Sequence, residues 1–477
     1  MKIIILGAGR VGQSVAESLV SEQNGITVID TDARALRDLE SRFDLRGVVG
    51  NGIDPQVLAE AGAKDTDLLI ACASMDETNL VCCKIAQVMF DIPTRIARVR
   101  SSGFAADDPV LGKDGFAVDR IICPEESVTN YIRKLIEYPE ALQVLEFAHG
   151  MLTMIAVRAF DGGLLVGKSL KTIPERLPNI DARIAAIFRH EQPIVPTGDT
   201  VIESGDEVFI IAASSHIRRV MTELRRMDQP IRRVIIAGGG NIGLRVAKRL
   251  EGRCMVKLID HNTGRSQFIA NQLGNGLVLL GDATDEELLQ QEAIDESDLF
   301  MALTNDDEDN IMSASLAKNL GCKRVLALIN RRVYAELVQG GPIDIAISPA
   351  LVSIGDLLTR VRRGFVVKVH SLRRGAAEAI ELVVHGDPKS SRVVGRRVGE
   401  LPPIEGAIVA AIVRGSEVDA PDNPSGYEVS AKAERGQVLI AHKEVMIESG
   451  DHVIVFCMSK KVVKKVEKLF EVGFHFF

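Results

Sequence analysis

The sequence predicts an α/β fold with two doubly wound parallel-sheet domains, each followed by a small α+β module. Three observations carry this prediction. A glycine-rich motif recurs in the second half of the 477-residue chain, apolar runs alternate with amphipathic stretches after each copy, and a further motif closes each half. Strands that alternate with helices are typical of parallel sheets, because parallel strands need crossover connections.

The composition is that of a globular protein, with 46% hydrophobic and 26% charged residues. Aromatic residues make up only 4% of the chain, so Val, Ile, Leu and Ala supply the apolar surface, as in sheets covered by helices. The length requires several domains. The net charge of -8 argues against a nucleic-acid binder. Seven Cys without a CxxC pattern indicate reduced thiols in a cytosolic protein.

The two halves repeat each other. KIIILGAGRVGQSVAESL in the first half aligns with RVIIAGGGNIGLRVAKRL in the second, and DLLIACASMDETN aligns with DLFMALTNDDEDN. The intervening TVIDTD matches KLIDHN, which pairs Asp30 with Asp260. We therefore interpret each half as a copy of one ancestral unit. In the first copy, the runs IIIL, TVID, LLIACA and RIARV are the expected strands.

The later parts of the halves match more loosely. GKSLKTI parallels GRRVGEL, and IESGDEVFIIA parallels IESGDHVIVFC. We expect four units: a Rossmann-like nucleotide-binding domain at 1–125, a small α+β module at 141–226, a second Rossmann-like domain at 232–350 and a second module at 366–470. The polar stretch VDAPDNPSGYEVSAKAERGQ at 418–437 is an expected surface loop of the last unit.

Each glycine motif is a candidate nucleotide site, since it follows an apolar strand, opens a helical pattern and precedes an acidic strand end by about 20 residues. The first glycine permits the tight turn, the second lets the backbone approach a pyrophosphate, and the third lets helix and strand pack closely. The candidate residues are Gly7, Gly9, Arg10, Val11, Gly12, Asp30, Asn51 and Arg98 in the first copy, and Gly238, Gly240, Asn241, Ile242, Gly243, Asp260 and Asp282 in the second.

The chemistry of these groups favours one class of ligand. The helix N-terminus offers free N–H groups to phosphates, and Asp30 and Asp260 would accept hydrogen bonds from ribose hydroxyls. Their charge disfavours a 2′-phosphate, which indicates NAD or NADH over NADP(H), while ATP or ADP would satisfy the same groups. We expect the Arg98 guanidinium to reach a phosphate. RVLALI, aligned with RIARVR, has Ala327 in its place, so the two sites can differ in ligand.

Other patterns in the sequence are interpreted as structural features. GGLLVGKS at 162–169 satisfies the phosphate-loop pattern of NTPases, but Pro174 interrupts the helix that this motif requires, so we interpret it as a turn. The acidic groups at 76–77 and 306–309 are expected helix N-caps, with a cation or partner site as the alternative. No His or Cys cluster predicts a metal site. KKVVKKVEKLF at the end of the last unit predicts a solvated lysine-rich helix, with docking to a partner as the alternative.

Two such glycine-motif units, each followed by a short module with GD(E/H)V, resemble the TrkA family of potassium-uptake subunits, which consist of tandem RCK domains (regulators of potassium conductance). The resemblance covers nearly the whole chain. It implies a cytoplasmic protein, peripheral on the inner face of the cell membrane, which docks on a potassium-translocating integral membrane subunit. It further implies nucleotide-dependent gating by a homotetramer whose eight N-type units form a ring. Asn51 stands where the family usually has Asp.

Two other classes of function stay open from the sequence. An NAD-dependent oxidoreductase is disfavoured, because no His, Lys or Tyr recurs at equivalent positions of both halves as a hydride-transfer acid or base. A free-standing sensor, whose α+β modules bind a small ligand, is the second alternative. Rossmann-like units serve many functions, so fold alone does not decide among these classes.

Overall fold

The computed structural model describes most of the chain, namely residues 1–20, 24–101, 103–104, 108–139, 141–163, 165–176, 180–190, 192–224, 230–338, 341–361, 365–372, 377–415 and 436–472.

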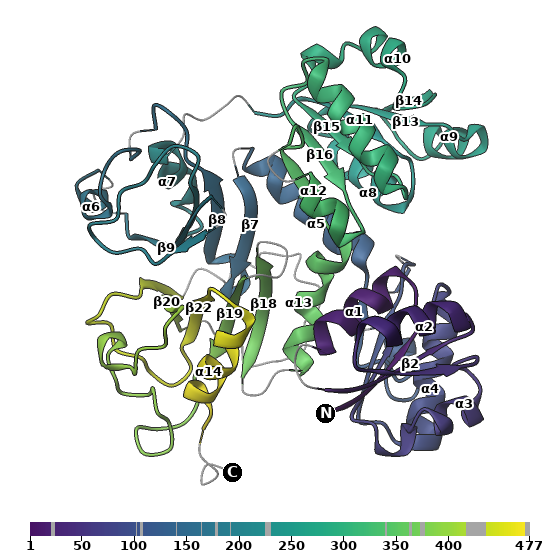
Figure 1. Cartoon of the computed structure of the whole chain (residues 1–477), viewed down its shortest axis with the longest axis horizontal. Helices are drawn as coiled ribbons and strands as arrows, with labels where there is room; N and C mark the ends of the chain where they lie inside the picture. Colours follow the sequence, from purple (N-terminus) through teal and green to yellow (C-terminus); the bar gives the residue numbers. More distant parts are fainter. Residues whose placement is uncertain are drawn as a thin grey trace. The chain divides into compact units, whose positions relative to one another are not determined.

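The first domain, purple in Figure 1, is a six-stranded parallel sheet with the order β3-β2-β1-β4-β5-β6. Because the chain starts at a central strand and winds outward in both directions, the sheet has a switch point between β1 and β4, where such folds bind ligands. The strands are β1 (Lys2–Leu6), β2 (Gly25–Asp30), β3 (Arg46–Val49), β4 (Leu68–Ala71), β5 (Thr94–Arg98) and β6 (Arg120–Ile122). The helices are α1 (Arg10–Val20), α2 (Ala33–Arg42), α3 (Pro55–Glu60) and α4 (Asp76–Phe90).

The second domain repeats this architecture with the order β14-β13-β12-β15-β16-β17. Its strands are β12 (Arg233–Ala237), β13 (Met255–Asp260), β14 (Leu277–Leu280), β15 (Leu299–Ala302), β16 (Val325–Leu328) and β17 (Ile345–Ile347). Its helices are α8 (Asn241–Leu250), α9 (Thr263–Ala270), α10 (Glu286–Gln291), α11 (Asp307–Asn319) and α12 (Arg332–Leu337). A helix follows the last strand of each sheet, α5 (Pro124–Glu137) in the first half and α13 (Pro349–Val361) in the second.

The two small modules are antiparallel five-stranded sheets with matching topology, β10-β9-β11-β8-β7 and β21-β20-β22-β19-β18. The first has β7 (Ala141–Phe147), β8 (Leu152–Arg158), β9 (Ala182–Arg189), β10 (Gln192–Ile194), β11 (Glu207–Ala213), α6 (Ile173–Arg176) and α7 (Ile217–Leu224). The second has β18 (Val366–Leu372), β19 (Ala377–Val383), β20 (Ala407–Arg414), β21 (Gln437–Ile440), β22 (His452–Cys457) and α14 (Lys460–Phe470). The predicted fold class is confirmed. The expected surface loop at 418–437 lies outside the described residues, apart from its last two positions.

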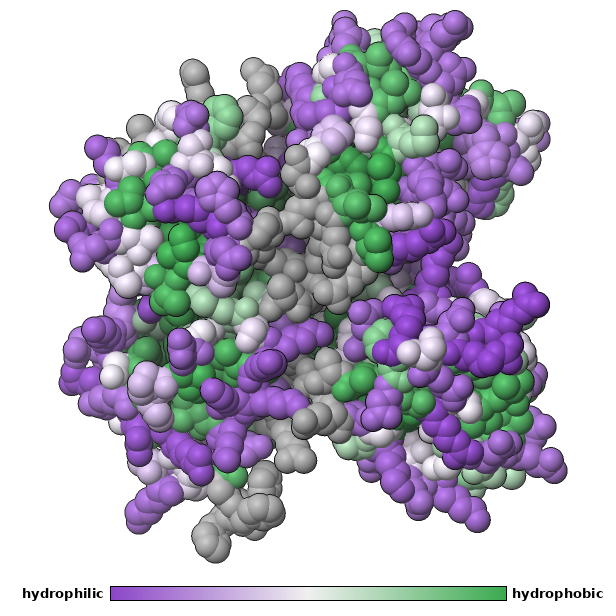
Figure 2. Space-filling view, in the orientation of Figure 1, coloured by the Kyte–Doolittle hydropathy of each residue, from purple (hydrophilic) through white to green (hydrophobic). Residues whose placement is uncertain are grey.

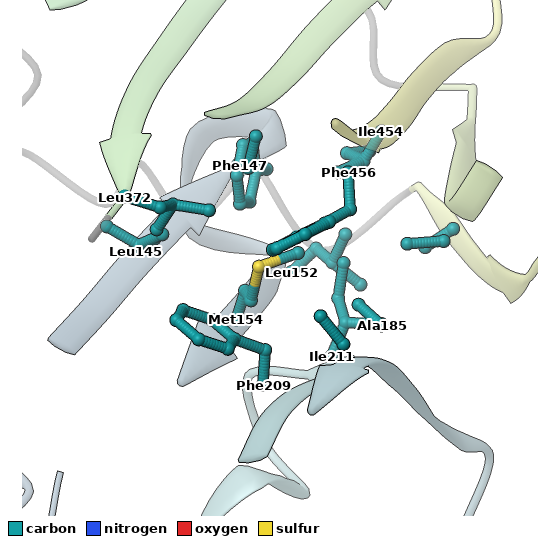
Figure 3. Close-up of a cluster of buried hydrophobic side chains, with 14 of the residues drawn as sticks. Leu145, Phe147, Leu152, Met154, Ala185, Phe209, Ile211, Leu372, Ile454 and Phe456 are labelled. Carbon is teal, nitrogen blue, oxygen red and sulfur yellow. The ribbon is translucent and has the colours of Figure 1, made fainter. Parts of the chain in front are cut away.

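The two α+β modules share one hydrophobic core. Phe209 on β11 and Phe456 on β22 lie with ring centroids 5.5 Å apart, and both point toward the cluster around Leu152 and Met154 (Figure 3). Leu372 on β18 belongs to the same cluster. Since each sheet has an apolar face that must be buried, packing the two repeats against each other satisfies both.

The GD motif that closes each half holds a buried carboxylate. Asp206 accepts hydrogen bonds from Nε and Nη2 of Arg189 at 2.9 and 2.8 Å, and from the backbone N–H of Glu203 at 2.9 Å. Asp451 accepts the same set from Arg414 at 2.9 Å each and from the N–H of Glu448 at 2.8 Å. The motif therefore specifies an ion pair with two hydrogen bonds, which ties β9 to the turn before β11 and β20 to the turn before β22.

The acid sensitivity of the first module should depend on Asp206. Burial raises the pKa of this carboxyl, but the Arg189 and Glu203 hydrogen bonds outweigh burial and hold the pKa below its usual value. Because the pKa is lower in the folded state, the stabilisation is complete above about pH 4, the ordinary range for Asp, and is lost as the pH falls through the folded pKa. In thermal unfolding between pH 7 and 3, the difference between wild type and Asp206→Asn should stay constant above about pH 5. It should shrink at lower pH, and a difference independent of pH would contradict this.

The described surface is mostly hydrophilic, with separate hydrophobic patches, on the face that Figure 2 shows. Among the described residues, none of the helices is both long enough and apolar enough to cross a membrane.

Candidate functional site

Both glycine loops make the tight turn that their first glycine was expected to allow. Gly7 has a φ of 102° and Gly238 has a φ of 98°, a backbone region that favours glycine. In each loop this residue donates its N–H to the end of the second strand, Gly7 to the carbonyl of Ile29 at 2.8 Å and Gly238 to that of Ile259 at 2.9 Å. The turn directs the chain from the central strand into the following helix.

The third glycine of each motif lies against the first. A Cβ atom on Gly12 would stand 1.8 Å from the carbonyl oxygen of Gly7, and one on Gly243 would stand 1.9 Å from that of Gly238. Real side chains do not approach backbone oxygen this closely, so only glycine fits. The third glycine therefore has the packing role that the motif predicts.

The second glycine of each motif faces open space. A Cβ atom on Gly9 or Gly240 would meet no atom within 4 Å. The helix bonds begin directly after it, with the N–H of Gln13 donating to Gly9 and that of Leu244 donating to Gly240. The N–H groups of Arg10, Val11 and Gly12, and those of Asn241, Ile242 and Gly243, come before the first N–H that donates to a helical carbonyl. They therefore lie at the end of the helix that attracts an anion.

The acidic residue at the end of the second strand is fixed to the glycine loop. Asp30 accepts from the N–H of Ala8 at 2.5 Å and from that of Asp32 at 2.8 Å. Asp260 accepts from Gly239 at 2.8 Å and from Asn262 at 2.9 Å. Both carboxylates are partly exposed. Each oxygen has a further lone pair, so the carboxylate can still accept from a ligand hydroxyl while the loop holds it in position.

The residues after the third strand are exposed at the same edge of the sheet. Asn51 accepts from the N–H of Ile53 at 3.2 Å. Asp282 accepts from the N–H and the hydroxyl of Thr284, both at 2.8 Å, and these bonds hold its pKa below the usual value. The second site therefore has an additional anionic group where the first has a neutral amide.

Arg98 lies at the end of β5 and is turned toward a carboxylate of its own domain. Its Nη2 atom lies 2.6 Å from Oε1 of Glu125, and both side chains are largely buried. To contact a phosphate, this guanidinium would have to rotate away from Glu125 or share it.

The sheet register also corrects the alignment of Arg98. Ala71 pairs with Ala97 in the first sheet, and Ala302 pairs with Ala327 in the second, so the equivalent of Arg98 is Leu328 rather than Ala327. The expected difference remains, because Leu328 is apolar and the second site has no arginine at this position.

The repeated Asp and Asn of the DETN and DEDN motifs shape the loops at the same sheet edge. Asn79 is buried and bonds both the N–H and the carbonyl of Ala73 and the carbonyl of Arg98, and Asn310 makes the same set with Thr304 and Leu328. These side chains hold the loops after the fourth and fifth strands together.

Asp306 is a helix N-cap, as expected, because its side chain accepts a hydrogen bond from the N–H of Asp309. Asp76 and Asp307 instead accept from backbone N–H groups of the loop after the fifth strand, at Arg100 and Ser101 in the first domain and at Asn330 and Arg331 in the second. In the described part of the chain no group of three or more His, Cys, Asp or Glu residues could hold a metal ion.

The structure adds one residue that the sequence analysis missed. Arg265 on α9 donates from Nε to the carbonyl of Gly239 at 2.6 Å, and its guanidinium stacks on Phe268. This places a cation beside the second glycine loop. The equivalent position on α2 is Ala35, so the cation belongs to one site alone. Comparing the two copies three positions after the helix cap could have revealed it.

The phosphate-loop pattern at 162–169 does not form a phosphate loop. The chain turns at Gly162 and Gly167, both with positive φ, and Gly163 donates to the carbonyl of Phe160. Lys168 precedes a three-residue 3-10 helix at Leu170–Thr172 instead of opening a long helix. The geometry agrees with the interpretation as a turn.

Comparison with known proteins places these features in a family. Residues 3–124 and 234–349 match the TrkA-N domain, and residues 154–225 match the TrkA-C domain. The Trk system potassium uptake protein TrkA of Halomonas elongata is 51% identical over 477 residues, with the whole of both chains covered. The chain belongs to the TrkA family. Members of the same name from Vibrio alginolyticus and Haemophilus influenzae are 51% and 46% identical over 472 residues, with 99% of each chain covered.

Solved structures agree on the fold of this TrkA-family chain. The crystal structure of the GsuK RCK domain has a TM-score of 0.59 and 19% identity, and the alignment covers 98% of this chain and 94% of that one. The GsuK channel bound to NAD has a TM-score of 0.57 and 18% identity, with 98% of this chain and 78% of that chain covered. The chain therefore has the tandem RCK architecture.

Proposed function

We propose that the chain is the peripheral nucleotide-binding regulatory subunit of a potassium uptake system. In this proposal NAD(H), or ATP or ADP, binds at the switch point of each Rossmann-like domain and favours one arrangement of the N-type units. The change is transmitted to a potassium-translocating membrane subunit on the cytoplasmic side. A ligand can shift such an equilibrium only by its difference in affinity between the two states, typically about 1–3 kcal/mol of coupling.

One observation carries the proposal. Both copies present the same open cradle, in which a carboxylate is locked to the glycine loop while Gly9 or Gly240 leaves space in front of a helix N-terminus. The N–H groups at the helix N-terminus suit a pyrophosphate, and the carboxylate suits a ribose. The NAD bound to the GsuK channel shows that a protein of this fold holds such a ligand. The assignment to potassium uptake rests on the name of the relatives.

Exposed apolar side chains support the homo-oligomeric part of the proposal. Val81 and Val88 lie seven residues apart on α4 and are both exposed, Val88 at 68%. The residue aligned with Val81 on α11 is Met312, which is exposed at 64%. Apolar side chains that recur on equivalent helices are typical of contact surfaces between units. A tetramer with a ring of eight N-type units would use such surfaces.

The first test is nucleotide-dependent thermal stability of the full chain with NAD, NADH, ATP, ADP and NADPH. A ligand that binds only the folded state adds about 2.7 kcal/mol at 100 times its Kd, so the unfolding midpoint should rise. Asp30→Asn and Asp260→Asn should each remove the part of the rise due to one site. Asp38→Asn, an exposed change on α2, is the matched control. If no nucleotide raised the midpoint, the glycine loops would be scaffold only.

The second arm measures gating. Potassium flux into vesicles that contain the membrane subunit should depend on this chain and on the nucleotide identified in the first arm. Flux that is unchanged by the chain with and without nucleotide would contradict the regulatory role, whatever the binding result. Stoichiometric turnover of the nicotinamide with a metabolite would instead favour an oxidoreductase.

A further inference from the structure

A pocket of about 520 Å³ lies between the two α+β modules, and no residue of either glycine loop lines it. Arg183 reaches it from β9 of the first module, and the second module supplies the remaining walls from 398–399, 401–404, β20, 441–443, β22 and α14. Its size falls in the range of about 300–1,000 Å³ that is usual for small-molecule sites.

The lining has an uneven chemistry. Three of the residues around the pocket are polar, namely Arg183, His442 and Lys443, and all three are basic. The others are apolar or glycine, and Leu469 and Phe470 of α14 are typical of them. A pocket with an apolar body and basic groups alone fits a ligand that has an apolar part and an anionic group.

Arg183 is the most informative of the basic groups. Its side chain is half-buried, and its Nη1 atom donates to the carbonyl oxygen of Ala441. The described part of the chain places no carboxylate within salt-bridge distance of this guanidinium. The nearby Asp181 is instead bound by His442 at 3.0 Å. A partly desolvated cation without a counter-ion is costly, and an anionic ligand would offset that cost.

The internal repeat strengthens this argument. In the antiparallel ladders Arg183 pairs with Ile211, while Ile408 on β20 pairs with Phe456. Since Ile211 and Phe456 occupy the same place in their two GD motifs, Ile408 is the equivalent of Arg183. The repeat therefore has an apolar residue at this position in one module and an arginine in the other, and both line the same pocket.

We infer that this pocket binds a small anionic amphiphile, with its carboxylate or phosphate on Arg183 and Lys443 and its hydrocarbon part against α14 and β20. A free fatty acid and a membrane phospholipid share this chemistry. The pocket shares no lining residue with the nucleotide cradles, so its occupation can be measured without nucleotide.

The test uses decanoate as the probe, with decyltrimethylammonium as its counterpart of opposite charge. Because the chain contains no Trp, Leu469→Trp places a single fluorescent reporter in the pocket. Decanoate below its micelle concentration should change the emission saturably, and decyltrimethylammonium should require at least about tenfold more, since a charge-assisted hydrogen bond is lost. Acetate, which lacks the tail, should have no effect.

Variants locate the head group. In the reporter background, Arg183→Leu should weaken decanoate binding about tenfold or more, and Arg183→Lys should retain part of the preference. Arg158→Leu, an exposed arginine of the same module outside the pocket, should change nothing. Binding of phosphatidylglycerol vesicles that depends on Arg183 would identify a membrane lipid as the source, and binding of free decanoate alone would identify a soluble acid.

Three results would overturn the inference: no response to decanoate, equal affinity for the two amphiphiles, or undiminished decanoate binding by Arg183→Leu. The comparison of the two amphiphiles is made with Arg183 in place. It therefore decides the question even where the Arg183→Leu chain fails to fold. None of these outcomes depends on nucleotide binding or on potassium flux.

Discussion

Replacement of Gly12 by alanine is expected to destabilise the first Rossmann-like domain strongly. The added Cβ would stand 1.8 Å from the carbonyl oxygen of Gly7, and this atom belongs to the backbone of the turn, so it cannot move aside as a side chain would. We expect a loss of about 4 kcal/mol or more, at the upper end for single substitutions, out of a usual total of about 5–15 kcal/mol. Urea unfolding followed by circular dichroism measures it.

Gly9→Ala is the matched control, because it is three residues away in the same motif. A Cβ there meets nothing within 4 Å, so stability should change by less than about 1 kcal/mol. The methyl group would occupy the space assigned to the pyrophosphate, so the nucleotide-dependent rise of the midpoint should fall. Equal destabilisation by both substitutions would show that the two glycines do not have the separate roles described above.

Replacement of Asp451 by alanine is expected to have the second largest effect. Asp451 is 1% exposed and accepts two hydrogen bonds from Arg414 and one from the N–H of Glu448. Its removal leaves Nε of Arg414 and the N–H of Glu448 without their acceptor, while the guanidinium keeps its bonds to Glu448 and to the carbonyl of Met446. Each buried donor that loses its acceptor typically costs about 1–3 kcal/mol. Thermal unfolding of the full chain should show the loss in the transition of the α+β modules.

Glu448→Ala is the control that distinguishes the contribution of a buried carboxylate from that of an exposed one. Glu448 pairs with the same guanidinium at 2.6 Å, but its side chain is 53% exposed. An exposed ion pair contributes about 0–1 kcal/mol, so this change should be small. If Glu448→Ala and Asp451→Ala lowered the free energy of unfolding equally, the stabilisation would come from the charge of Arg414 and not from the buried hydrogen bonds to Asp451.

Much of the fold followed from local pattern. The glycine motif after an apolar run predicted β1–α1 and β12–α8, because a tight turn and a close helix–strand contact need glycine at fixed spacing. The strands β3 and β6 were not among the apolar runs singled out, since RGVV and RII are short and carry arginine. Their place in the sheet comes from pairing with β2 and β5, which no local pattern specifies.

The candidate site was likewise predictable only in part from local sequence pattern. The sequence placed Asp30 and Asp260 at the ends of their strands, but the bonds from Ala8 and Gly239 that fix each carboxylate depend on neighbouring parallel strands. Arg98 illustrates the limit, since its position at a strand end was correct while its partner, Glu125, lies 27 residues away. Arg265 was missed for a related reason, because a cation on α9 concerns the loop only once α9 folds beside it.

The sequence by itself determined the repeat, the two glycine turns and the family, because these depend on residue type at fixed short spacing. Tertiary structure alone decided which groups meet across the repeat: the shared core of the two modules, the correspondence of Arg98 with Leu328, and the pocket that Arg183 enters from the first module. The physical reason is that side-chain contacts between distant segments depend on strand register and sheet packing, and both are settled only when apolar faces are buried together.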